Sequence, residues 1–114
     1  MARNRWKIHK FGGSSLADAD CFRRVGSLML DYPDACVGVV VSAMGGMTDA
    51  LLQLAALAER DDRAFYDELN AIGERYASTA RELVSNDRLV AVLDAWSQDA
   101  EDIKNVLQAI ALVK

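Results

Sequence analysis

In Lys10-Phe11-Gly12-Gly13-Ser14-Ser15-Leu16, a glycine pair follows the strand-like run from Trp6 to His9. A second pair stands in Ser42-Ala43-Met44-Gly45-Gly46-Met47-Thr48-Asp49, after the apolar run from Val37 to Val41. Glycine adopts backbone conformations that are closed to other residues, and it lets an oxygen-rich ligand approach the main chain closely. Free N–H groups at the start of a following helix attract anions. Both segments therefore predict anion-binding turns between a strand and a helix.

The spacing of apolar residues predicts a strand, a helix and a second strand in the first part of the chain. Apolar side chains from Leu16 to Met29 recur at helical spacing, which is typical of an amphipathic helix, with Ser14 or Ser15 as its N-cap. The turn around Pro33 ends that helix. The β-branched run that ends at Val41 predicts a strand covered on both faces.

A strand, a helix and a strand within this length imply parallel pairing with a right-handed crossover. Ligands of open α/β sheets bind beyond the carboxyl ends of the strands. We therefore expect the two glycine turns at one edge of the sheet, around one site for phosphoryl transfer. Lys10 is the candidate cation that offsets the charge of a transferred phosphoryl group. Because Lys10 precedes the glycines, the segment is not a Walker A loop.

The second half of the chain reads as helix throughout, with Thr48 or Asp49 as the cap of its first helix. Gly73 is interpreted as a glycine tolerated on a helix surface. Trp6 and Trp96 are interpreted as packing residues. The chain is apolar up to its last residues, and two strands leave sheet edges without partners. We therefore expect the chain to be the N-terminal piece of a longer protein.

Composition excludes several classes of function. The chain has 114 residues, is 52% hydrophobic and carries a net charge of −4, which argues against a nucleic-acid partner. Its apolar runs are far shorter than the roughly 18 residues that cross a membrane, and its basic start lacks the pattern of a signal peptide. A cytoplasmic location is expected. Cys21 and Cys36 are expected to be reduced, and His9 to be structural.

The segments Lys10 to Asp18 and Val39 to Asp49 resemble the N-terminal part of aspartate kinases, within the amino acid kinase family. The start of the chain is most similar to the bifunctional aspartokinase/homoserine dehydrogenases. This resemblance implies an α/β fold of three layers, α/β/α, similar to carbamate kinase. Residues 1–114 would then be an incomplete N-terminal part of the catalytic domain, with two parallel strands followed by mostly helix.

The resemblance also implies an activity and its site residues. The reaction is transfer of the γ-phosphoryl group of ATP, with Mg²⁺, to the side-chain carboxylate of L-aspartate, giving 4-phospho-L-aspartate, the first step towards lysine, threonine and methionine. The full-length protein would be a homo-oligomer, and the fragment alone would be inactive, because other family motifs lie beyond Lys114. No metal ligand is assigned. The residues implied are Lys10 as catalytic residue, then Lys10, Phe11, Gly12, Gly13 and Ser14 for ATP, and Ser42 and Thr48 for aspartate.

Two alternatives stay open. One is another amino acid kinase, acting on glutamate, acetylglutamate or uridylate, because these share a lysine followed by glycines. The Ser-x-x-Gly-Gly-x-Thr-Asp pattern that begins at Ser42 favours aspartate. The other is a helical interaction module without catalysis, since half of the chain has the pattern of amphipathic helix.

Overall fold

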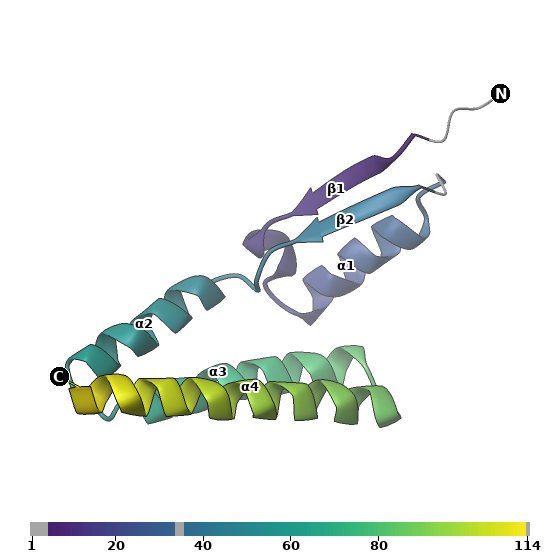
Figure 1. The fold of residues 1–114 in the computed structure, drawn as a ribbon. Coiled ribbons are helices and arrows are strands. Elements are labelled where there is room, and N and C mark those ends of the chain that lie inside the picture. Colours follow the sequence, from purple (N-terminus) through teal and green to yellow (C-terminus); the bar gives the residue numbers. More distant parts are fainter. Residues whose placement is uncertain (1–4, 34–35, 114) are drawn as a thin grey trace. The chain divides into compact units, whose positions relative to one another are not determined.

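The computed structural model describes residues 5–33 and 36–113. Along the chain follow β1 (Lys7–Phe11), the 3-10 turn η1 (Gly13–Leu16), α1 (Ala19–Leu30), β2 (Val37–Val41), α2 (Met47–Glu59), α3 (Phe65–Leu83) and α4 (Asn86–Val113), as Figure 1 shows. The chain forms two compact units, one ending at Gly46 and the other beginning at Met47. The predicted mixed α/β class is confirmed.

The first unit is a strand, a helix and a strand that form a parallel pair. β1 and β2 run parallel, in a register from Lys7 opposite Val37 to Phe11 opposite Val41. At the end of the pair the backbone N–H of Ser42 donates to the carbonyl oxygen of Phe11, at 3.1 Å. The carboxyl ends of both strands therefore lie at the same edge of the sheet (Figure 1), as the sequence predicts.

The start of α1 differs from the prediction. Ser14 and Ser15 belong to η1 and do not cap the helix. The N-cap is Asp18, whose Oδ1 accepts a hydrogen bond from the backbone N–H of Cys21 at 2.9 Å. The reason is local, because the N–H of Ser15 bonds to the carbonyl of Gly12 and tightens the chain into a separate turn before the helix begins.

The two faces of the sheet are covered unequally. The ring of His9 meets that of Tyr32, just after α1, edge to face at 4.5 Å between centroids. Because side chains alternate along a strand, Lys10 lies on the opposite face, and it is exposed. Val40, which pairs with Lys10 and lies on the same face, is 50% exposed, so the expectation that β2 is covered on both faces is wrong for the described residues. One helix cannot cover both faces of a sheet.

The second unit is helical, as predicted. A short break at Val84 and Ser85 separates α3 from α4, and the two helices lie side by side in Figure 1. Phe65 and Leu54 are each 1% exposed and form part of the core. α2 begins at Met47, so Thr48 and Asp49, the two caps predicted from the sequence, both lie within its first turn and do not precede it. In the part of the chain that is described, no helix is both long and apolar enough to span a bilayer.

Candidate functional site

The turn after β1 leaves open space beside its main chain at Gly12. Gly12 has extended backbone angles, φ −83° and ψ −178°, which any residue adopts. A Cβ atom at this position would meet no atom within 4 Å. Neither the backbone conformation nor the packing therefore requires glycine here, and the absence of a side chain leaves room for a ligand to approach.

The same turn presents backbone donors. Among the described residues, the structure records no hydrogen bond from the backbone N–H groups of Gly13 and Ser14. Ser14 is exposed. Neighbouring unpaired N–H groups in a turn form a concavity that suits anions. The turn offers donors and no acidic side chain of its own.

The two glycine turns meet through their backbones. A Cβ atom on Gly45 would lie 2.9 Å from the carbonyl oxygen of Gly13 and 3.4 Å from Cβ of Ala17. A Cβ atom on Gly13 would lie 3.3 Å from Cα of Gly45 and 3.6 Å from the carbonyl oxygen of Ala43. The first distance is too short for any side chain to fit without a shift of the backbone. The predicted convergence of the two turns at one sheet edge is therefore observed between Gly13 and Gly45.

Gly46 needs glycine for a different reason. Its φ is +77°, in the left-handed region that other residues rarely adopt, and a Cβ atom there would meet nothing within 4 Å. Sequence reasoning recognised the second glycine pair but gave Gly45 and Gly46 no separate roles. The pair itself was the available signal, and only coordinates distinguish a close contact from a left-handed turn.

Lys10 stands near the carboxyl end of β1, opposite Val40 in the parallel register. Its side chain is exposed on the sheet face opposite His9, and no ion pair is recorded for it within the described ranges. A free ammonium group at this edge is available to an anion bound at the glycine turn. Phe11, the next residue, is half-buried, and its carbonyl oxygen already accepts from Ser42.

Ser42 follows β2 directly, and its exposed hydroxyl donates to the carbonyl oxygen of Ala43 at 2.7 Å. That hydroxyl keeps its acceptor lone pairs for another group. Thr48 is exposed in the first turn of α2 and belongs to the second unit. The turns of Gly13 and Gly45 thus meet within the first unit, whereas Thr48 belongs to the second unit.

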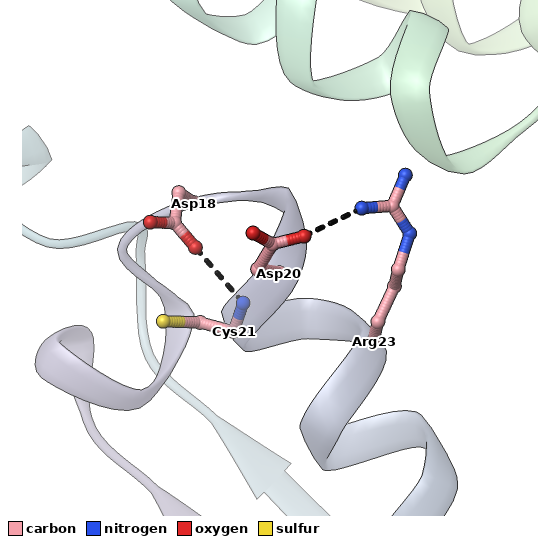
Figure 2. A network of polar contacts seen from close by, with 4 residues as sticks. All are labelled: Asp18, Asp20, Cys21 and Arg23. Carbon is pink, nitrogen blue, oxygen red and sulfur yellow. Dashed lines mark hydrogen bonds and ion pairs between the residues drawn. The ribbon is translucent and has the colours of Figure 1, made fainter.

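The beginning of α1 is occupied by acidic side chains, as Figure 2 shows. Asp18 accepts from the N–H of Cys21, and this hydrogen bond holds the pKa of Asp18 below its ordinary value. Asp20 forms an ion pair with Arg23 at 2.7 Å (Figure 2). Acidic side chains thus occupy part of the N-terminus of α1, and the expectation that this helix start attracts an anion stays a prediction. The N–H groups of the turn before it have no acidic side chain among them.

The structural role expected of His9 stays a prediction. Nε2 of His9 is buried without a hydrogen-bond partner, while its ring packs against Tyr32. Cys21 and Cys36 are free and half-buried. Within residues 5–33 and 36–113 no group of three or more His, Cys, Asp or Glu side chains gathers in a way that could hold a metal ion.

Two parallel strands with a lysine near their carboxyl ends and two glycine turns in contact are consistent with the fold expected for the chain, and the match of the Amino acid kinase family to residues 5–111 shows that this chain belongs to that family. Among curated proteins, it is 32% identical over 105 residues to bifunctional aspartokinase/homoserine dehydrogenase 2, chloroplastic, of Arabidopsis thaliana, covering 92% of this chain and 12% of the relative.

Two further relatives agree. Bifunctional aspartokinase/homoserine dehydrogenase 2 of Escherichia coli (strain K12) is 35% identical over 109 residues, covering 82% of this chain and 13% of that protein. Aspartokinase 1, chloroplastic, of Arabidopsis thaliana is 30% identical over 110 residues, covering 94% of this chain and 18% of that protein. The chain thus spans less than a fifth of the length of these relatives, and the similarity extends over most of its own length.

Proposed function

We propose that this chain contributes the phosphate-binding edge of an aspartate kinase, which transfers the γ-phosphoryl group of Mg-ATP to the side-chain carboxylate of L-aspartate. The observation that supports this most strongly is the backbone contact of Gly13 with Gly45 at the carboxyl ends of two parallel strands. The relatives are aspartokinases, alone or joined to homoserine dehydrogenase, which favours aspartate as the acceptor.

The residues of the first turn fit a triphosphate. The ammonium group of Lys10 is a cation, and the N–H groups of Gly13 and Ser14 are hydrogen-bond donors. Gly12 leaves open space beside its main chain. Phosphate oxygens accept hydrogen bonds from such groups. Phe11 would act through its main chain, which fixes the end of β1. Mg²⁺ would enter with ATP as part of the substrate. The carboxylates of Asp18 and Asp20 make contacts at the start of α1 and are assigned no part in binding it.

The acceptor would bind at the second turn. The hydroxyls of Ser42 and Thr48 are exposed and can hydrogen-bond a small amino acid. One oxygen of the aspartate side-chain carboxylate forms a bond to the γ-phosphorus, and the bond from that phosphorus to the bridging oxygen breaks, leaving ADP. Both reactants are anions, so their repulsion must be offset. Lys10 would be the catalytic residue in this sense, stabilising charge on the transferred group.

The test is an acceptor panel with the complete gene product. L-aspartate, L-glutamate, N-acetyl-L-glutamate and uridine monophosphate are each supplied with Mg-ATP, and ADP release and acyl phosphate, trapped as the hydroxamate, are measured. We expect turnover with L-aspartate. Turnover with another acceptor alone would replace the proposal by that kinase, and ATP binding without turnover on any acceptor would favour the non-catalytic interaction module.

The proposal extends to the chain's place in the protein. We expect residues 1–114 to be part of the catalytic domain and to lack turnover when purified alone, because the aspartokinase relatives are several times longer. We expect the complete gene product to be a homo-oligomer, which light scattering can measure. A cytoplasmic location stays a prediction, since the relatives include chloroplastic proteins as well as one of Escherichia coli.

A further inference from the structure

Gly45 lies in the turn proposed for the acceptor, yet its nearest neighbours belong to the turn proposed for ATP. A Cβ atom at position 45 would be 2.9 Å from the Gly13 carbonyl oxygen and 3.4 Å from the Ala17 side chain. The first of these contacts is with backbone, which cannot rotate out of the way as a side chain can. A side chain at position 45 would therefore move the peptide of Gly13.

That peptide is part of the candidate phosphate turn. The N–H of Ser14 belongs to the same peptide group as the Gly13 carbonyl, because the planar unit joins the two. A displacement of the Gly13 oxygen therefore rotates the Ser14 N–H as well. Hydrogen bonds weaken steeply when donor and acceptor lose alignment. The position of Gly45 thus sets the direction of a donor in a turn to which Gly45 does not belong.

We propose that Gly45 is a positioning residue for nucleotide, which holds the Gly13–Ser14 peptide in the orientation that receives the phosphates of ATP. This role rests on the proposed function and extends it across the two turns. If Gly45 served the acceptor turn alone, a substitution at Gly45 would leave the affinity for nucleotide unchanged. The proposed role predicts that such a substitution lowers this affinity.

The experiment compares Gly45→Ala with Gly26→Ala in the complete gene product. Gly26 lies on the exposed side of α1, where a Cβ atom would meet nothing within 4 Å, so this control adds the same methyl group without a clash. The Kd for Mg-ATP is measured by calorimetry without acceptor. We expect Gly45→Ala to weaken Mg-ATP binding about tenfold or more, and Gly26→Ala to leave it unchanged.

A second variant separates the two contacts of Gly45. Ala17→Gly in the Gly45→Ala background removes the 3.4 Å contact and leaves the contact with the Gly13 oxygen. We expect nucleotide binding to stay weak in this double variant, and recovery of binding would overturn the role assigned to the Gly13 peptide. Amide NMR shifts of Ser14 give a readout that needs no ligand, and we expect them to change in Gly45→Ala and not in Gly26→Ala.

The outcomes separate this role from the proposed function. If the unsubstituted protein binds Mg-ATP and Gly45→Ala binds it equally well, or loses affinity only for the acceptor, the role of Gly45 is wrong while the kinase proposal stands. If the unsubstituted protein binds no Mg-ATP, the kinase proposal fails and this role fails with it. If Gly45→Ala does not fold, Gly13→Ala, with its looser 3.3 Å approach to Cα of Gly45, is tested for the same Ser14 shift, whose absence would overturn the role.

Discussion

The indole of Trp96 on α4 lies against Gly73 on α3, so closely that a Cβ atom on Gly73 would be 3.0 Å from Nε1 of Trp96. The ring of Tyr76 stands beside the same indole, with 4.7 Å between ring centroids. Gly73 therefore permits the close packing of two helices, and its interpretation as a glycine tolerated on the surface is wrong. The interpretation of Trp96 as a packing residue is confirmed, whereas Trp6 is 67% exposed and is not one in the described chain.

Gly73→Ala should therefore fail to gain the stability that alanine normally brings to a helix. Alanine is favoured over glycine in a helix interior by about 1 kcal/mol, and Gly26→Ala, with open space around it, should show that gain. At Gly73 the overpacking against Trp96 should lower the free energy of unfolding by about 1–2 kcal/mol relative to the Gly26 variant. Urea unfolding measures both. Equal gains at the two positions would contradict the contact.

A double-mutant cycle makes this prediction sharper. Trp96→Ala alone should be destabilising, because the indole fills space between α3 and α4. Adding Gly73→Ala to that variant should then be stabilising, since the clash is gone. The coupling energy between the two positions should be on the order of 1 kcal/mol or more. A coupling energy near zero would show that the indole moves away freely.

Lys10→Ala should reduce kcat of the proposed reaction about a hundredfold or more, because a charge aligned with the transferred group is lost. Lys7→Ala is the matched control, since Lys7 is exposed on the same strand, about 10 Å nearer its start. Steady-state kinetics of both variants, with circular dichroism to confirm the fold, tests this. Equal losses from the two lysines would point to a general effect of charge.

Gly12→Ala should separate binding from folding. The backbone angles of Gly12 suit alanine and no atom lies near the added Cβ, so the unfolding midpoint should be unchanged or slightly higher. The methyl group would occupy space that the phosphates are proposed to use, and Mg-ATP affinity should fall about tenfold. Calorimetry and thermal unfolding on one preparation measure both. A stable variant with normal ATP affinity would remove Gly12 from the site.

Substitutions at Ser42 and Thr48 should act on the acceptor alone. Ser42→Ala and Thr48→Val each remove one hydroxyl, and each should raise the KM for L-aspartate about five- to tenfold, the effect of about one hydrogen bond. The Kd for Mg-ATP should stay unchanged. Ser27→Ala on the exposed surface of α1 is the control. An unchanged KM in both variants would remove these hydroxyls from the acceptor site.

The stabilisation of α1 by its N-cap, Asp18, should be lost in acid. The hydrogen bond from Cys21 holds the pKa of Asp18 below its ordinary value in the folded chain. The stabilisation is therefore complete above the unfolded-state pKa of about 4, and it is lost as the pH falls through the lower, folded-state pKa. The Tm of the unsubstituted protein should exceed that of Asp18→Ala by a constant amount from neutral pH to about pH 5. Below that pH the difference should shrink. Asp18→Asn keeps a neutral cap and should show no such titration at this position.

The elements themselves could be predicted from the sequence because their signals are local. The spacing of apolar residues indicates which segments are strands and which are helices, and a strand followed by a helix and a strand leaves parallel pairing as the favoured arrangement. That pairing alone places Lys10 and both glycine turns at one edge. The candidate phosphate site could therefore be proposed from the sequence alone.

The choice among neighbouring candidates could not be made in this way. Ser14, Ser15 and Asp18 are all good N-caps, and Asp18 serves because the bond between Ser15 and Gly12 inserts a separate turn. Likewise, the valines of β2 show a buried pattern, but exposure depends on what covers the sheet. Such outcomes depend on which groups compete for the same hydrogen bond or the same apolar surface.

The order of strands and helices and the place of the lysine at the end of the first strand thus follow from residue types and their spacing, and the family follows from the resemblance of two motif segments. The tertiary structure decided what each glycine does: Gly45 touches Gly13, Gly46 turns the chain, Gly73 receives an indole and Gly12 leaves space open. All four carry the same side-chain hydrogen in the sequence. They differ in their backbone angles and in the atoms that surround them, and both are set by how distant parts of the chain pack.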